Sequence, residues 1–145
     1  RCGCGFRRHW TRRGLMHIGF ASVAEVDKLW PLIVADIQKA CRQAPELLTA
    51  GELWQMCRSG NGFLCIAHNG DEVFASSVWR FEDDAFRCWS LAGKNMRVWL
   101  GPMREFIEKV ARENGSTRLL TKGRCGWLRV FKEARKTGDD YEVTL

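Results

Sequence analysis

The sequence predicts an α/β (α+β) domain with a mixed, mostly antiparallel twisted sheet and helices on both faces. Three observations predict this class. The chain has 145 residues, which suits one domain, and 46% of them are hydrophobic. Three strand patterns follow one another over residues 63–92. After that segment, helical and strand periodicities alternate, as in a sheet that is covered by helices.

The N-terminal part of the domain reads as a strand and two helices. Residues 17–21 form a short strand, and Ser22 with Glu25 has the spacing of a capping box, in which each residue satisfies a free amide of the other. The helix that follows is expected to be interrupted at Pro31, because proline lacks an amide hydrogen, and to resume up to about residue 43.

A second capping box, Thr49 with Glu52, precedes a short helix over residues 53–58. The Asn69-Gly70 pair then predicts a hairpin, since both residues tolerate a positive φ. The antiparallel strands are expected at residues 63–67, 72–81 and 86–92.

The C-terminal part is expected to alternate between helix and strand. Pro102 is taken as the start of a helix whose apolar stripe runs to Asn114. Trp127, with Phe131 and Ala134, marks the inner face of another helix. The predicted elements are a helix at 103–114, a strand at 118–121, a helix at 127–136 and a strand at 141–145.

The positive charge is concentrated at the N-terminus. Residues 1–15 contain five arginines and no acidic residue, whereas the rest of the chain has 18 basic and 17 acidic residues. We interpret residues 1–15 as a basic arm, disordered or not native, ahead of a domain that spans residues 16–145. Because the domain is almost neutral, nucleic acid is not the expected partner, although the arm could bind it.

The seven cysteines are scattered and most of them lie inside apolar patterns, which favours a reducing, cytoplasmic setting over a disulfide framework. Cys2, Cys4 and His9 lack a second ligand pair at zinc-finger spacing, so no metal is expected. The longest apolar run, residues 29–35, is too short to span a bilayer.

Over residues 17–145, this order of elements resembles the GNAT acyl-CoA-dependent N-acetyltransferases. Residues 111–119 look like the end of the central helix of that family and its next strand. Gly123-Arg124-Cys125-Gly126-Trp127 resembles the Gly-Arg-x-Gly-Trp segment of small GNAT-like proteins encoded in bacteriophage genomes. The resemblance implies acetyl-CoA as cosubstrate and a location in the cytoplasm of a bacterial host.

The resemblance also implies where the cosubstrate binds. The family holds the pyrophosphate on a Gln/Arg-x-x-Gly-x-Gly/Ala loop before the central helix. Here Lys94, Arg97 and Gly101 occupy that stretch, but the spacing from Arg97 to Gly101 is one residue too long and Pro102 lacks an amide hydrogen. The alternative is an ordinary polar loop. Arg124 is a further candidate for phosphate or pantetheine, the alternative being an ion pair with Asp83 or Glu113.

The implied chemistry is direct attack of an amine on the thioester. Backbone amides near Ser90, Leu91 and Ala92 would polarise the thioester carbonyl. Glu82 and Asp83, with Asp84, are candidate bases, the alternative being a solvated turn. Many members of the family use a tyrosine on the helix after the fifth strand as general acid, but residues 127–136 contain none. Tyr141, the only tyrosine in the chain, is the remaining candidate.

The function expected from the sequence is therefore an acetyl-CoA-dependent N-acetyltransferase that acts on an unidentified amine. The alternative is a non-catalytic GNAT-fold phage protein in assembly or host interaction, which the departures in the loop and the tyrosine favour. The expected partners are acyl-CoA with an amine, or a protein. No membrane partner is expected, and a homodimer is left open.

Overall fold

The structure is a computed structural model that describes residues 16–44, 47–122 and 131–145. The described residues form one mixed sheet with the strand order β1-β2-β3-β4-β5-β7-β6. All neighbouring strands are antiparallel except β4 and β5, which are parallel. The strands are β1 (His17–Phe20), β2 (Phe63–His68), β3 (Val73–Glu82), β4 (Ala85–Gly93), β5 (Arg118–Lys122), β6 (Arg135–Thr137) and β7 (Asp140–Thr144). The predicted fold class is confirmed.

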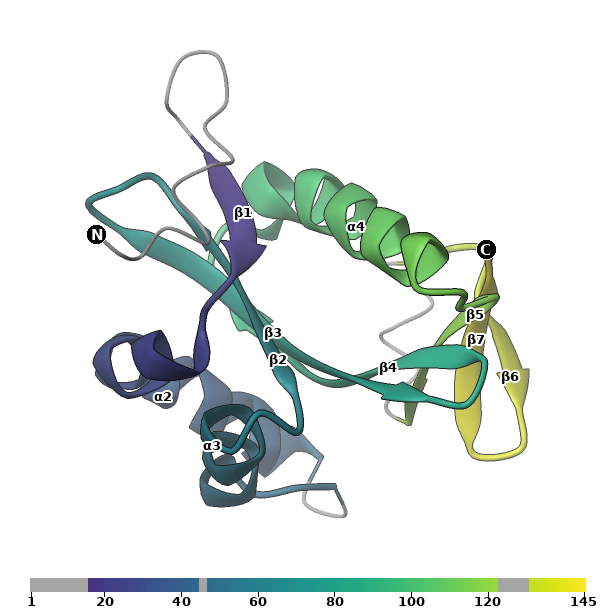
Figure 1. Cartoon of the computed structure of the whole chain (residues 1–145), viewed down its shortest axis with the longest axis horizontal. Coiled ribbons are helices and arrows are strands. Elements are labelled where there is room, and N and C mark those ends of the chain that lie inside the picture. Colours follow the sequence, from purple (N-terminus) through teal and green to yellow (C-terminus); the bar gives the residue numbers. More distant parts are fainter. Residues whose placement is uncertain (1–15, 45–46, 123–130) are drawn as a thin grey trace.

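Three helices cover the two faces of the sheet (Figure 1). They are α2 (Val23–Gln43), α3 (Ala50–Arg58) and α4 (Met96–Glu113). Helices α2 and α3 share one face, where they bury Ile37, Leu53 and Ile66. Helix α4 packs on the other face through Trp99, Met103 and Ile107. None of the helices in the described ranges is long and apolar enough to cross a membrane.

Both predicted capping boxes are confirmed. Ser22 Oγ accepts from Glu25 N at 3.3 Å, and Ser22 N donates to Glu25 Oε1 at 2.7 Å. Thr49 and Glu52 make the same two bonds at 3.1 and 2.8 Å. The predicted interruption at Pro31 is wrong, because α2 continues through it. This proline lies on the exposed side of α2, where water can satisfy the carbonyl that lost its amide partner.

The β2–β3 hairpin is confirmed, with a loop over residues 69–72. Asn69 organises this loop through its side chain: Oδ1 accepts from the amides of Asp71 at 2.9 Å and of Glu72 at 2.7 Å. Gly70 supplies the positive φ, at 99°. Asn69 therefore acts by hydrogen bonding rather than by adopting a positive φ itself.

Helix α4 begins at Met96, so the prediction of a start after Pro102 is wrong. Trp99 explains the earlier start. It lies one turn before Met103, is fully buried, and extends the apolar stripe of α4 backwards. Pro102 is inside the helix on its exposed side.

The predicted helix over residues 127–136 is wrong where the structure describes it. Residues 131–134 form a turn, and Arg135–Thr137 is strand β6, paired antiparallel with β7. Gly138, with a φ of 64°, and Asp139 form the two-residue turn between these strands. Phe131 and Ala134 are buried as predicted, but they reach the core from a turn. Trp127 lies outside the described residues.

Candidate active site

The parallel strands β4 and β5 pair over only part of their length. The ladder runs from Ala85–Arg118 to Cys88–Thr121 and ends there, whereas β4 continues through residues 89–93. The hydroxyl of Thr121 lies at the end of this ladder, 3.1 Å from Cys88 O and 3.2 Å from Lys122 O. Beyond this point no described strand pairs with the β5 side of β4, and we call the opening there the β4–β5 gap.

The backbone of β4 directs particular amides into the β4–β5 gap. Lys94 N donates to Phe74 O of β3 at 3.0 Å, so the amide of Lys94 points toward β3. Because amides alternate along an antiparallel strand, Ala92 and Ser90 also face β3, whereas Leu91 faces the gap. Of the three predicted residues 90–92, Leu91 therefore supplies the amide that could polarise a carbonyl.

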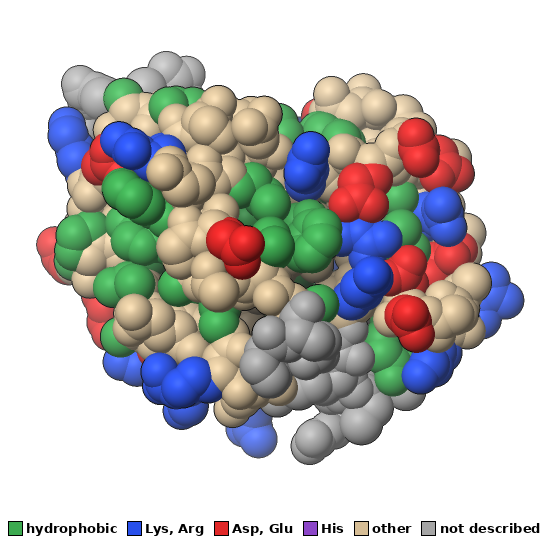
Figure 2. Space-filling model, turned by 90° about the horizontal axis from the view of Figure 1, so that it is seen from below, with side chains coloured by type: hydrophobic (Ala, Val, Ile, Leu, Met, Phe, Trp, Pro, Cys, Tyr) green, Lys and Arg blue, Asp and Glu red, His purple; other side chains and the backbone are tan. Residues whose placement is uncertain are grey.

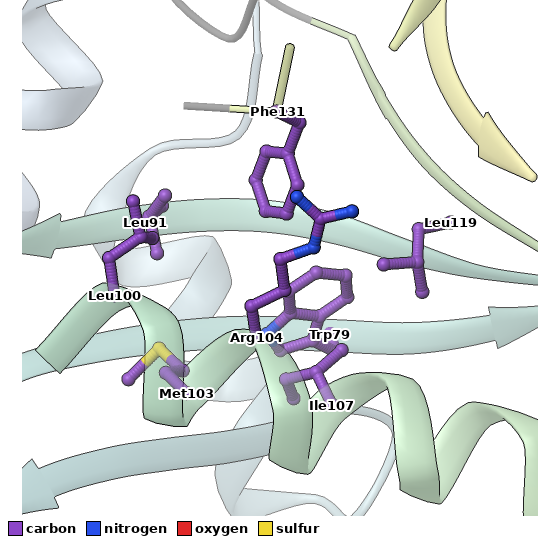
Figure 3. Close-up of a pocket in the computed structure, with 8 residues that line it drawn as sticks. All are labelled: Trp79, Leu91, Leu100, Met103, Arg104, Ile107, Leu119 and Phe131. Atoms are coloured by element: carbon purple, nitrogen blue, oxygen red, sulfur yellow. The ribbon is translucent and has the colours of Figure 1, made fainter. Parts of the chain in front are cut away.

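An apolar cavity of about 10 Å³ lies beside the gap on the α4 face (Figure 3). It has room for about one water molecule. The guanidinium of Arg104 lies over the ring of Phe131, 4.7 Å from the ring centroid. Arg104 is also ion-paired with Glu108 at 2.6 Å and with Glu133. The lining comes from five segments of the chain: Trp79, Leu91, Leu100, Met103, Arg104, Ile107, Leu119 and Phe131.

The N-terminus of α4 follows the end of β4 directly. Asn95 precedes the helix in the left-handed conformation, with φ 56° and ψ 53°, and makes no side-chain cap. The amides of Met96 and Arg97 are therefore uncapped by a side chain, and they carry the partial positive charge of the helix end. The side chains of Lys94 and Arg97 are exposed here and form no ion pair with a described residue. This cluster can hold an anion.

The structure does not bring Gly101 into that cluster. Gly101 is exposed in the second turn of α4, where a backbone amide is bonded within the helix. Its predicted place in a loop is wrong. Arg124 lies outside the described residues, so its predicted contact with the cosubstrate stays a prediction, as does the likeness to bacteriophage proteins.

Solved structures share the fold of this chain, and 139 chains match. The GNAT domain of S. lividans PAT has a TM-score of 0.66 at 14% identity, covering 90% of each chain. A GNAT family acetyltransferase from Brucella melitensis, in complex with acetyl-CoA, has a TM-score of 0.65 at 12% identity, covering 90% of this chain and 88% of that chain. The protein has the GNAT acetyltransferase fold.

A third structure with the GNAT fold, the putative acetyltransferase yncA from Salmonella typhimurium with acetyl-CoA, has a TM-score of 0.62 at 9% identity. It covers 90% of this chain and 94% of that chain. No family model and no curated protein matches the sequence. The predicted resemblance is thus confirmed for the fold.

Within the GNAT fold, Tyr141 lies closest to the end of the β4–β5 ladder among the three predicted catalytic residues. It is buried on β7 and pairs with Thr121, the last residue of β5 in that ladder. Val143, two residues later, belongs to the core under α4, so Tyr141 faces the same side as the cavity. Lys136 Nζ lies 5.8 Å from the centroid of its ring.

The two predicted carboxylates lie at the far end of β4. Asp83 is exposed in the β3–β4 turn, with a φ of 51°. From that turn to Leu91, β4 extends roughly 20 Å at about 3.4 Å per residue. Glu82 accepts a hydrogen bond from Arg87 Nε at 2.8 Å, so one of its oxygens is occupied. The structure therefore does not bring Asp83 to the β4–β5 gap.

Sequence reasoning missed Arg87, which organises the face of the sheet opposite α4. Its guanidinium donates to Asp140 through both terminal nitrogens, at 2.9 and 3.2 Å. Arg118 makes a similar bridge between Asp84 and Glu142. Figure 2, which views this face, shows the resulting mixture of blue and red side chains on the side of β5, β6 and β7. No periodicity marks such pairs in the sequence.

The ion pair between Arg87 and Asp140 is expected to make a contribution to stability that depends on pH. The hydrogen bond from Arg87 holds the pKa of Asp140 below its ordinary value. Its pKa in the unfolded chain is about 3.9. The pair therefore stabilises the fold fully above that pH, and the contribution is lost as the pH falls through the lower pKa of the folded state. We expect Asp140→Asn to lower the Tm at pH 7, and the difference from wild type to shrink below about pH 4.

Circular dichroism melting between neutral and acidic pH measures this difference. Asp139→Asn is the matched control, since Asp139 is exposed in the neighbouring turn and pairs with no described residue. It should leave the Tm unchanged at every pH. A deficit of Asp140→Asn that stays constant into acid would contradict the assignment.

Proposed function

We propose that the protein is an acetyl-CoA-dependent N-acetyltransferase that transfers an acetyl group directly to an amine. The observation that carries this proposal is the β4–β5 gap. There β4 runs beyond its last pair with β5 and leads straight into the uncapped N-terminus of α4. The structural neighbours from Brucella melitensis and Salmonella typhimurium, which were determined with acetyl-CoA, support it.

The residues around the gap fit the parts of acetyl-CoA. The amides of Met96 and Arg97, with the side chains of Lys94 and Arg97, would hold the diphosphate, because a helix N-terminus and two cations both favour an anion. The backbone of Leu91 would receive the thioester end, and the apolar cavity would receive the methyl group. Bound there, acetyl-CoA supplies an acetyl group that is activated as a thioester.

The chain itself would then stabilise charge and move a proton. As the amine attacks the carbonyl carbon, a C–N bond forms, the C–S bond breaks, and the Leu91 amide stabilises the negative charge on the oxygen. The nitrogen loses one proton and the departing sulfur gains one, so the exchange is balanced. Tyr141, on the cavity side of the sheet, is the candidate to donate that proton.

The state of Cys88 favours direct transfer over a covalent intermediate. This thiol lies at the end of the β4–β5 ladder, next to the proposed reaction centre. Burial raises its pKa to about 12, so the thiolate that would act as nucleophile is scarce at neutral pH.

The second candidate function is a non-catalytic protein that keeps the fold to bind a partner, in phage assembly or in a host. Two observations favour it. Only Lys94 and Asn95 separate β4 from α4, so few loop amides are available to a diphosphate. The cavity of about 10 Å³ also has room for only about one water molecule, so its lining must rearrange before a larger group enters.

Binding of acetyl-CoA separates the two functions. The double change Lys94→Ala and Arg97→Ala should weaken binding at least about tenfold, which is about 1.4 kcal/mol, because it removes both cations next to the uncapped amides. Isothermal titration calorimetry measures the Kd, and circular dichroism checks the fold. With wild type, acetyl-CoA at a hundred times its Kd should add about 2.7 kcal/mol of stability.

Lys109→Ala with Arg112→Ala is the matched control, since it removes two exposed cations from the other end of the same helix. This variant should bind like wild type. If wild type does not bind acetyl-CoA even at millimolar concentration, the enzyme proposal fails and the non-catalytic function replaces it.

A further inference from the structure

Two neighbouring hydrogen-bond donors on β4 are buried without a partner in the described part of the chain. They are the indole nitrogen of Trp89 and the hydroxyl of Ser90. Ser90 as a whole is 9% exposed. An indole N–H can only donate. Leaving a buried donor unpaired costs free energy, so such a pair needs an explanation.

The two donors lie together because β4 carries a β-bulge at this point. Val78 pairs with Ser90 and Trp79 with Cys88, so Trp89 is the extra residue. Trp89 packs against the core under α2 and α3, to which Val78 also belongs. Both side chains therefore face α2 and α3, on the side of the sheet opposite the apolar cavity.

Arg87 is near but does not satisfy them. Its guanidinium lies 5.7 Å from the centroid of the Trp89 ring, and it brings donors, not acceptors. Those donors are taken up by Glu82 and Asp140. A partner for Trp89 must instead present an oxygen, or another acceptor atom, from outside the described chain.

We propose that Trp89 and Ser90 bind an oxygen of the amine substrate, which enters from the α2–α3 face while acetyl-CoA occupies the α4 side. The inference rests on the proposed acetyltransferase function. Ser90 is adjacent to Leu91, whose amide faces the reacting carbonyl, and consecutive Cα atoms are about 3.8 Å apart. We therefore expect the bound oxygen to belong to a group close to the attacking nitrogen in the substrate. A carbonyl on the carbon next to the amine meets this requirement, as in a peptide N-terminus or an amino-acid amide.

Neither donor atom is reached by solvent in this structure. The side chains that cover them must shift when a substrate binds, as in other enzymes that close around a substrate. A polyamine or a simple alkylamine has no oxygen to offer, and it would leave both donors unpaired. The site should consequently reject such amines.

Three matched pairs of amines test the substrate class: alaninamide with ethylamine, phenylalaninamide with phenethylamine, and lysinamide with cadaverine. The members of a pair differ in structure only by the carboxamide, which also makes the amine less basic, so kcat/KM is compared on the concentration of unprotonated amine. With acetyl-CoA as donor, we expect kcat/KM to be at least about tenfold higher for the carboxamide member, as for sites built to bond a substrate group. Equal values within each pair overturn the inference and leave the acetyltransferase proposal standing.

Trp89→Phe and Ser90→Ala test the residues. Each should lower kcat/KM for the carboxamide members about tenfold, so that the two members of each pair become nearly equal. The Tm without substrate should stay the same or rise, because the group removed had no partner. Trp54→Phe is the control: its indole donates to Asp27 at 2.8 Å, so the Tm should fall with kcat/KM unchanged.

A lower Tm for Trp89→Phe and Ser90→Ala without a selective loss on the carboxamides would assign both donors a structural role and overturn the inference. If wild type binds acetyl-CoA but acetylates none of the carboxamides, the inference about the substrate is also overturned. The proposed binding of the cosubstrate then still stands. Absence of acetyl-CoA binding instead removes the proposed function itself.

Discussion

Replacing Trp99 by alanine is expected to lower the free energy of unfolding by about 3–5 kcal/mol, as truncations of fully buried aromatic residues do. Trp99 is 0% exposed and is the largest fully buried side chain of the described core. Its indole nitrogen also donates to Lys94 O at 2.7 Å, which fixes the turn between β4 and α4. Urea denaturation followed by tryptophan fluorescence or circular dichroism measures the loss.

Trp99→Phe separates the two contributions. It keeps most of the buried ring and removes the hydrogen bond, so it should cost about 1 kcal/mol plus a small packing term. Because that bond holds the N-terminus of α4, acetyl-CoA binding should weaken in both variants. A cost below about 1 kcal/mol for Trp99→Ala would contradict the burial of this ring.

Gly93→Ala is expected to destabilise the protein by about 1–3 kcal/mol, the range for overpacked sites. A Cβ at this position would lie 2.6 Å from Phe74 O and 2.7 Å from the Cα of Ala75. Both are backbone atoms of β3 and cannot rotate away. The end of β4 must therefore move, and with it the anion-binding cluster at the start of α4, so acetyl-CoA affinity should fall as well.

Gly101→Ala is the matched control for this change. Gly101 is exposed in α4, and a Cβ there would meet no atom within 4 Å. Alanine is favoured over glycine inside a helix by about 1 kcal/mol, so this variant should be more stable than wild type. Chemical denaturation compares the two. Equal effects of both substitutions would show that the close approach of β3 to Gly93 does not constrain the fold.

Much of the fold was predictable because its signals are local. The capping boxes at Ser22 and Thr49 and the Asn69 turn depend on residues a few positions apart. Strand β6 was not predicted because a local signal for a helix was misleading there. The spacing of Phe131 and Ala134 is that of a helix, so the Gly138-Asp139 turn was not recognised. The hairpin of β6 and β7 depends on pairing between the two strands, which residue spacing does not reveal.

The candidate site was less predictable than the fold. The sequence could place Lys94 and Arg97 between a strand and a helix, and the structure finds them there. The direction of the Leu91 amide depends on the register of β4 against β3, and the cavity combines side chains from five segments. Such features follow from tertiary arrangement, and so does the isolation of Trp89 and Ser90 from any partner in the described chain.

The outermost strand β6 also bears on how copies of this protein can associate. In the described sheet it leaves one row of backbone groups unpaired, a place where a second chain could add. All three of its residues are exposed, and two of them, Arg135 and Lys136, are cationic. Two copies joined antiparallel about the middle of β6 would set Lys136 beside Lys136, and like charges in that position repel. This repulsion discourages two copies from joining their sheets through β6 in that register.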